Sequence, residues 1–78
     1  MMLQGNDLSD EIPTELSKLV NLTTLNLGHN SFIGSIPSAL FYLKKLSTLN
    51  MEDNKLNSSI PDTIVNLIFL TELLLGNN

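Results

Sequence analysis

The sequence contains no cysteine and no arginine, and these two absences exclude several classes of protein. Without cysteine the chain has neither disulfide bonds nor thiolate ligands for a metal, while its redox compartment stays open. Recognition of duplex nucleic acid needs clustered basic side chains, and the only adjacent basic pair is Lys44-Lys45. The net charge of -4 therefore argues against a nucleic-acid partner.

Long apolar runs are also missing. No stretch approaches the ~18 residues of a membrane-spanning helix, and the first residues have neither a basic start nor an apolar segment, so we expect no signal peptide and no direct membrane insertion by this chain. The 78 residues suffice for one small domain, and the apolar share of 42% is typical of a folded chain. Tryptophan is absent and leucine dominates, which favours a repeat over an irregular core.

Matching residues recur every 24 positions along the whole chain. Ile-Pro occurs at residues 12–13, 36–37 and 60–61, and further columns of apolar residues begin at Leu3, Leu8, Leu16, Leu19, Leu22 and Leu25. Asparagine forms a column of its own, at Asn6, Asn30, Asn54 and Asn78. Self-similarity at a fixed period identifies a repeat protein. We therefore expect one repeat array over residues 1–78, with no linker and no second domain.

Each repeat should begin with a short strand that leads into a bend. Leu25-Asn26-Leu27 alternates apolar, polar and apolar residues, as does a strand with one buried face, and the pattern recurs at residues 49–51 and 73–75. Strands 24 residues apart cannot be joined by tight hairpins, so we expect them to stack in parallel, about 4.8 Å apart. The asparagine column follows the strands, where an amide can donate to and accept from backbone groups inside the bend. The alternative is a plain surface asparagine.

The return path of each repeat contains the Ile-Pro element. Proline biases the preceding residue towards extended geometry, so Ile36 should be extended and Pro37 can open a short helix. Leu40 and Leu43 lie three residues apart and can both face inward. The length available predicts one or two turns, partly of 3₁₀ type.

The unit from Leu22 to Pro37 resembles a known family pattern. Its fixed positions match LxxLxLxxNxLxGxIP, the signature of plant-type extracellular leucine-rich repeats, and the resemblance covers all 78 residues. It implies an α/β repeat: a right-handed solenoid with a 24-residue period, a parallel sheet on the concave face and short 3₁₀ or α segments on the convex side. A second short extended segment should follow the asparagine turn. The cysteine-bearing caps of such arrays are missing, so we interpret the chain as about three and a quarter uncapped units from a longer array.

The sequence departs from the family pattern at two columns. The signature glycine is present only at Gly34, with Asp10 and Ser58 in its place elsewhere, and strain is expected there because glycine alone adopts positive φ without cost. The helical segment usually carries a glycine where this chain has Phe41 and Val65. We expect these two side chains, together with Ile68 and Phe69, to add apolar surface near the convex side.

The outward strand positions form the candidate ligand face. Only these positions, together with the residues just after each strand, can vary without disturbing the coil. They include Gln4, Gly28 and Thr48, and the principal candidates are Asn26, His29, Asn50, Glu52, Asp53, Glu72 and Leu74. The alternative is a solvated sheet that touches nothing in this part of the array. Leu74 is either a binding anchor or a residue covered by the next repeat.

His29, Asp53 and Glu52 raise the question of catalysis or metal binding. A histidine between two carboxylates can form a pH-sensitive pair or half of a metal site, but two further ligands are lacking, and an ordinary surface pair is the alternative. No serine or threonine stands with His29 and an acid as a nucleophile set. We therefore expect no enzyme activity, no metal and no cofactor.

Two asparagines fit the N-x-[ST] pattern of N-glycosylation, Asn21 and Asn57. Such triplets are common by chance, and they gain weight only from the resemblance to an extracellular family. Both asparagines are expected off the strand face, which would leave the face free of sugar.

The resemblance implies a binding scaffold from the ectodomain of a plant receptor-like kinase or receptor-like protein. Its partners would be a peptide, protein or small-molecule ligand, a co-receptor and the neighbouring repeats of the parent array. The parent would lie at the plasma membrane on the extracellular side, or be secreted to the cell wall, and any kinase activity would belong to another domain. The alternatives are a piece of a secreted inhibitor resembling polygalacturonase-inhibiting proteins, and a short protein that adds its repeats to a full-length receptor.

Overall fold

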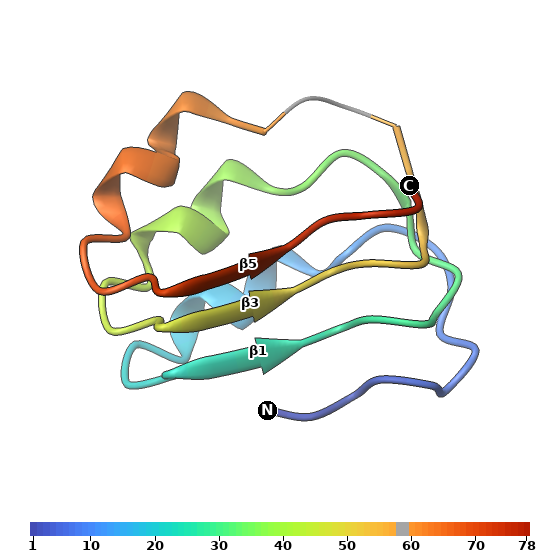
Figure 1. The fold of residues 1–78 in the computed structure, drawn as a ribbon, viewed down its shortest axis with the longest axis horizontal. Helices are drawn as coiled ribbons and strands as arrows, with labels where there is room; N and C mark the ends of the chain where they lie inside the picture. Colours follow the sequence, from blue (N-terminus) through green and yellow to red (C-terminus); the bar gives the residue numbers. More distant parts are fainter. Residues whose placement is uncertain (58–59) are drawn as a thin grey trace.

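The computed structural model describes residues 1–57 and 60–78. In this part of the chain, strands alternate with 3₁₀ segments, so that each repeat forms one turn of a coil (Figure 1). One sheet has the order β1-β3-β5, with strands Thr24–Asn26, Thr48–Asn50 and Glu72–Leu74. The 3₁₀ segments η1, η2 and η3 lie on the opposite side of the coil and span Thr14–Lys18, Ser38–Tyr42 and Asp62–Asn66.

The three strands pair in parallel, as the sequence predicts. Leu25 faces Leu49 in the register, and Leu49 faces Leu73. These side chains point inward, and those of Leu25 and Leu49 are completely buried. The outward residues Asn26 and Asn50 are only partly buried. The strand phase predicted from the apolar alternation is therefore present in the structure.

A second, smaller parallel sheet lies beyond the bend that follows the main strands. It consists of β2 (Ile33–Gly34) and β4 (Lys55–Leu56). This is the extended segment that the family resemblance implies. Isolated bridges extend both sheets into the first turn of the coil, where Met2 pairs with Asn26 and Glu11 with Ile33.

Proline precedes each of the three 3₁₀ segments in the described residues. Pro13, Pro37 and Pro61 have extended backbone angles and act as N-terminal caps rather than as first helical residues. Leu40 and Leu43 both point into the core and are completely buried. The segments are entirely of 3₁₀ type over five residues each.

Phe41 corrects one expectation from the sequence. We predicted convex apolar surface at Phe41 and Val65, but Phe41 is 1% exposed whereas Val65 is 78% exposed. The two residues share a column, so the difference comes from their neighbours. Segment η2 packs between η1 and η3, whereas η3 has a neighbouring segment on one side only. Phe41 therefore belongs to the hydrophobic core.

The strain expected in the glycine column is visible at one of its two replaced positions. Asp10 has φ of 66°, close to the 79° of Gly34. A residue with a Cβ atom adopts this left-handed conformation at a cost of about 1–2 kcal/mol. Ser58, the other replacement, lies outside the described residues. In the described part of the chain, no helix is long and apolar enough to cross a membrane.

Candidate ligand-binding face

The outward side chains of β1, β3 and β5 form rows that cross the strands. The parallel register aligns Thr24 with Thr48 and Thr48 with Glu72. It likewise aligns Asn26 with Asn50 and Asn50 with Leu74. Of the predicted face residues, these rows bring Asn26, Asn50, Glu72 and Leu74 onto adjoining strands.

The amides of Asn26 and Asn50 have a fixed orientation. The Oδ1 atom of Asn26 accepts a hydrogen bond from the backbone N–H of Gly28 at 3.0 Å, and Oδ1 of Asn50 accepts one from Glu52 at 3.0 Å. A backbone N–H can only donate, so the oxygen of each amide must face it and the NH₂ group must turn away. Within the described residues, neither NH₂ group makes a hydrogen bond. Each amide therefore offers two donors to a ligand.

Gly28 differs from its predicted place on the exposed face. It is buried, because the amides of both neighbouring asparagines lie over it. A Cβ atom at this position would lie 3.0 Å from Oδ1 of Asn50 and 3.3 Å from Oδ1 of Asn26. A side chain at residue 28 would therefore displace the amides, and glycine keeps them in place.

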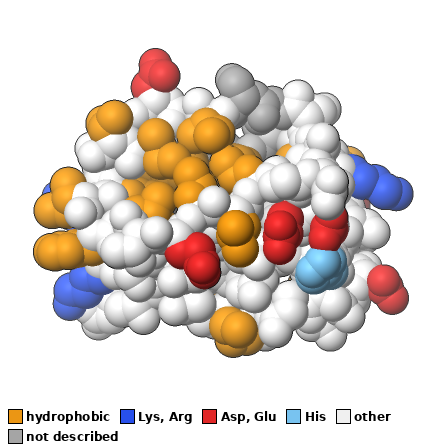
Figure 2. Space-filling model, in the orientation of Figure 1, with side chains coloured by type: hydrophobic (Ala, Val, Ile, Leu, Met, Phe, Trp, Pro, Cys, Tyr) orange, Lys and Arg blue, Asp and Glu red, His pale blue; other side chains and the backbone are white. Residues whose placement is uncertain are grey.

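Charged residues lie on the face at the start of β5 and beyond the ends of β1 and β3 (Figure 2). Nδ1 of His29 lies 2.7 Å from Oδ2 of Asp53, and their side chains are 59% and 32% exposed. Glu52 is half-buried and Glu72 is exposed, and neither forms an ion pair within the described residues. Figure 2 shows the histidine beside acidic side chains on one side of the molecule. The lysines belong to η1, to β4 and to the turn after η2.

His29 and Asp53 also share a backbone feature that the sequence did not reveal. Their φ angles are 54° and 58°, and Gly5 and Asn77, at the equivalent positions, have 71° and 59°. This column therefore makes the same left-handed turn in every repeat. The turn orients the side chains of both His29 and Asp53.

The asparagine column lies inside the bend, where its amides connect consecutive turns of the coil. Nδ2 of Asn54 donates to Met51 O and Glu52 O in its own turn and to Leu27 O in the preceding turn, at 2.9 to 3.3 Å. Its Oδ1 accepts the N–H of Phe32 at 3.0 Å. Equivalent hydrogen bonds are made by Asn30 and Asn78, and Asn6 bonds Leu3 O and Gln4 O in its own turn.

A second ladder of hydrogen bonds, which we did not predict from the sequence, lies at the entrance to each strand. The hydroxyl of Ser47 donates to Thr23 O at 3.1 Å, and the hydroxyl of Thr71 donates to Ser47 O at 3.2 Å. The signal was present, because residues 23, 47 and 71 are all hydroxyl residues on the common spacing.

Both candidate glycosylation sites lie away from the β1-β3-β5 face. Asn21 is exposed in the turn between η1 and β1, and its Oδ1 accepts a hydrogen bond from Lys45 Nζ at 2.9 Å. Asn57 is exposed just after β4, but Ser58 and Ser59 of its triplet lie outside the described residues. No group of three metal-ligating side chains gathers in the parts of the chain that the structure describes.

Comparison with known proteins identifies similar sequences and structures. The family model described as Leucine rich repeat matches residues 20–78. The receptor kinase HAESA of Arabidopsis, crystallised with the peptide hormone IDA and the co-receptor SERK1, is 36% identical with a TM-score of 0.92, and the match covers 96% of this chain and 13% of that chain. For a chain of the BIR3–SERK2 complex from Arabidopsis thaliana, the identity is 42%, the TM-score 0.95, and the coverage 100% and 42%.

A plant ice-binding protein has the same fold, with 36% identity, a TM-score of 0.81, and coverage of 85% of this chain and 21% of that chain. No curated protein sequence matches. The chain spans less than half the length of each of these three structures.

Proposed function

The chain belongs to the leucine-rich repeat family, and we propose that it is a ligand-binding segment of a plant cell-surface receptor ectodomain. Its ligand is a peptide or protein that docks on the face of β1, β3 and β5. Likeness to the receptor kinase structure that contains a peptide hormone and a co-receptor supports this proposal. On the same basis, the parent protein lies at the plasma membrane with these repeats outside the cell, and a co-receptor is a further partner.

The finer geometry of the array is part of the proposal. The coil is right-handed with a 24-residue repeat and a concave β1-β3-β5 face. A crossover between parallel strands of one sheet is almost always right-handed. The paired residues of β1 and β3, such as Leu25 and Leu49, are 24 positions apart, which supports the period.

One observation supports this function above the others: two asparagine amides point outward from the sheet, beside acidic side chains that have no basic partner within the described residues. Asn26 and Asn50 present NH₂ donors, while Glu52 and Glu72 lack ion-pair partners within the described residues. Leu74 adds a half-buried apolar side chain to the same face. Donors, negative charge and one apolar contact suit a ligand with exposed carbonyl groups, a basic group and a small apolar anchor.

The same residues favour binding over chemistry. His29 pairs with Asp53, and within the described residues neither side chain has a hydrogen bond to a serine or threonine hydroxyl that would complete a catalytic set. We infer that this segment has no catalytic activity of its own and that any kinase activity belongs to another domain of the parent.

Two other functions are compatible with the fold. A secreted inhibitor of a wall-degrading enzyme would use the same face against a protein. Ice binding is supported only by the likeness to the plant ice-binding protein, and the charged groups of Glu52, Asp53 and Glu72 interrupt the regular rows of Thr and Asn.

The proposal can be tested by selecting peptides that bind to the face of β1, β3 and β5. These units are placed between the capping units of a leucine-rich repeat ectodomain and used to select from a displayed library of random 12-residue peptides. The proposal expects enriched peptides with lysine or arginine near an apolar residue. Their affinity should fall at least tenfold when Asn50, Glu52, Asp53 and Leu74 are all replaced by serine.

A matched control replaces the same number of exposed residues on other faces by serine, namely Glu15, Lys18, Lys44 and Asp62. The control should bind with unchanged affinity. Unchanged binding by the first variant would show that these repeats act as a spacer in the array.

A further inference from the structure

Two rows of side chains cross the turns that lead from the 3₁₀ segments into β1, β3 and β5. Positions 20, 44 and 68 form one row, and positions 21, 45 and 69 form the other, because equivalent residues of successive turns are 24 positions apart. All six side chains are exposed. We call this surface the turn flank, and its residues are Val20, Asn21, Lys44, Lys45, Ile68 and Phe69.

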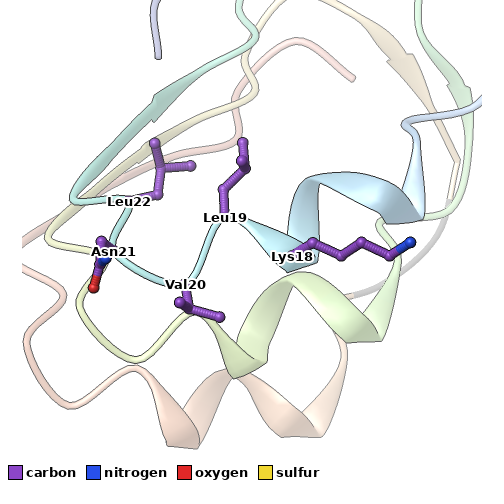
Figure 3. A pocket seen from close by; sticks show the side chains of 5 residues that line it. All are labelled: Lys18, Leu19, Val20, Asn21 and Leu22. Atoms are coloured by element: carbon purple, nitrogen blue, oxygen red, sulfur yellow. The ribbon is translucent and has the colours of Figure 1, made fainter.

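The first of these turns shows how the chain divides its side chains between the core and the turn flank. Figure 3 shows residues 18–22, which line a hollow beside the turn. Leu19 and Leu22 point into the coil, whereas Val20 and Asn21 point away from it. The turn therefore alternates two inward leucines with two outward positions between them.

The middle turn shows that the two rows stay on the surface when turns are present on both sides. There Leu43 and Leu46, which correspond to the inward leucines, are completely buried. Lys44 and Lys45 are exposed, although η2 has a neighbouring 3₁₀ segment on each side. The outward direction of both rows is thus a property of the turn itself, and it holds inside a longer array.

Three large apolar side chains occupy these outward positions. Val20, Ile68 and Phe69 are 64%, 76% and 61% exposed. Figure 2 shows hydrophobic and lysine side chains side by side at the left edge of the molecule, where Figure 1 places the turns into the three strands. Packing inside the coil does not require an apolar residue at these positions, since lysine fills them in the middle turn. Exposed apolar side chains that lie together mark a contact surface.

The turn flank also carries positive charge in a chain whose net charge is -4. Neither Lys44 nor Lys45 forms an ion pair within the described residues. Nζ of Lys45 donates to Oδ1 of Asn21 at 2.9 Å, and this neutral partner leaves the charge of the ammonium group uncompensated. None of the eight acidic residues belongs to the flank. Its electrostatic character is therefore opposite to that of the β1-β3-β5 face.

We propose that the turn flank is a second docking surface, which binds an acidic segment of a partner protein. Carboxylates of the segment pair with Lys44 and Lys45, and its apolar side chains pack against Ile68 and Phe69. Turns of a parallel coil are about 4.8 Å apart, so each row spans roughly 10 Å, the length of about three residues of an extended peptide. A short segment therefore reaches both the charged and the apolar parts of the flank.

Other anionic partners match the flank less well. Nucleic acid needs a larger cluster of basic side chains than two lysines supply. Two lysines also give only a weak attraction to anionic lipid. An acidic polysaccharide offers no apolar side chain to cover Ile68 and Phe69. An acidic protein segment supplies both the negative charge and the apolar contacts.

The test measures binding of a labelled synthetic peptide in which glutamate alternates with leucine and phenylalanine. The units are placed between capping units, so that turns cover both ends, and are produced in bacteria, so that no glycan on Asn21 covers the flank. Fluorescence anisotropy should show saturable binding. Lys44→Gln should weaken it about fivefold, whereas Lys55→Gln, which removes the same charge from the exposed lysine of β4, should change it less than about twofold.

A second pair of variants tests the apolar part of the flank. Ile68→Ser should weaken binding of the same peptide about fivefold, because it removes apolar surface that the peptide buries. Ile33→Ser, at an exposed isoleucine of β2, is the matched control and should leave the affinity unchanged. Circular dichroism verifies that all four variants are folded.

Larger losses for Lys44→Gln and Ile68→Ser than for their controls would support the docking surface. No binding of the peptide, or equal losses within either pair, would overturn it. Equal affinity for polygalacturonate, or for vesicles of phosphatidylcholine and phosphatidylserine, would also overturn it, because the flank would then attract anions in general.

The docking surface can be separated experimentally from the proposed function. The variant of the β1-β3-β5 face in which Asn50, Glu52, Asp53 and Leu74 are replaced by serine should bind the acidic peptide with unchanged affinity. A loss of binding in this variant would place the acidic peptide on the strand face and overturn the assignment to the turn flank. The basic peptides selected by the strand face should in turn be unaffected by Lys44→Gln, so each proposal can fail without the other.

Discussion

Truncating Leu49 and Asn50 to alanine separates the inward from the outward face of β3. The two residues are neighbours in the chain but point to opposite sides of the sheet. Leu49 is completely buried between Leu25 and Leu73 of the adjoining strands. Asn50 is partly exposed, and its Oδ1 accepts one hydrogen bond, from Glu52 N–H.

The expected magnitudes follow from these contacts. Leu49→Ala removes a buried branched side chain and leaves a cavity between two strands, which costs about 2–5 kcal/mol. Asn50→Ala removes a hydrogen bond that water can partly replace, so the loss should be about 0.5–1.5 kcal/mol. An outward residue without this hydrogen bond would lose at most about 0.5 kcal/mol.

Urea unfolding followed by circular dichroism measures both losses. The units should be placed between capping units, because the isolated chain has a small core and a loss of several kcal/mol could unfold it completely. The midpoint of Leu49→Ala should fall well below that of Asn50→Ala at similar dependence on urea. Equal losses would show that the assigned strand phase is wrong.

Four further substitutions test other parts of the coil. Asn54→Ala leaves buried backbone groups without partners and should cost at least about 2 kcal/mol in urea unfolding, whereas Asn6→Ala, at the exposed first turn, should cost less than about 1 kcal/mol. Asp10→Gly should raise the unfolding free energy by up to about 1 kcal/mol, because glycine relieves the left-handed strain, and a loss would contradict that reading. His29→Ala should change stability by less than about 1 kcal/mol, since its pair with Asp53 is largely exposed, and a larger change in thermal unfolding would show a coupling that the geometry does not contain.

The features that the sequence predicted well are those fixed by repetition. The inward position of Leu25 and Leu49 and the bend at Asn30 and Asn54 follow from columns in which the same contacts recur at each turn. A residue in such a column has the same neighbours in each interior repeat. The residue type that recurs in a column therefore predicts whether that position is buried and which contacts it makes.

The features that were missed depend on how neighbouring turns cover a position. Phe41 is buried because η1 and η3 flank it, while Val65, in the same column, has one such neighbour. Gly28 is buried because the amides of Asn26 and Asn50 fold over it. A column pattern does not contain this information, since it describes each turn separately from the side chains above and below. The ligand face was predicted by excluding the positions that packing and the bend fix. This identifies its residues but does not show how the amides of Asn26 and Asn50 are oriented.

The amide of each asparagine in the bend also has a mechanical consequence. Nδ2 of Asn78 donates to Met51 O of the preceding turn, and Nδ2 of Asn54 donates to Leu27 O, so the same side-chain contact adds to the backbone hydrogen bonds that join each turn to the one before it. A force applied at the C-terminus would break the hydrogen bonds of the last turn first, and then those of each preceding turn in order. The chain should lengthen in discrete steps, each releasing the contour of one repeat, roughly 80 Å of extended backbone. A coil built in this way yields one turn at a time under tension, while the remaining turns keep the β1-β3-β5 face intact.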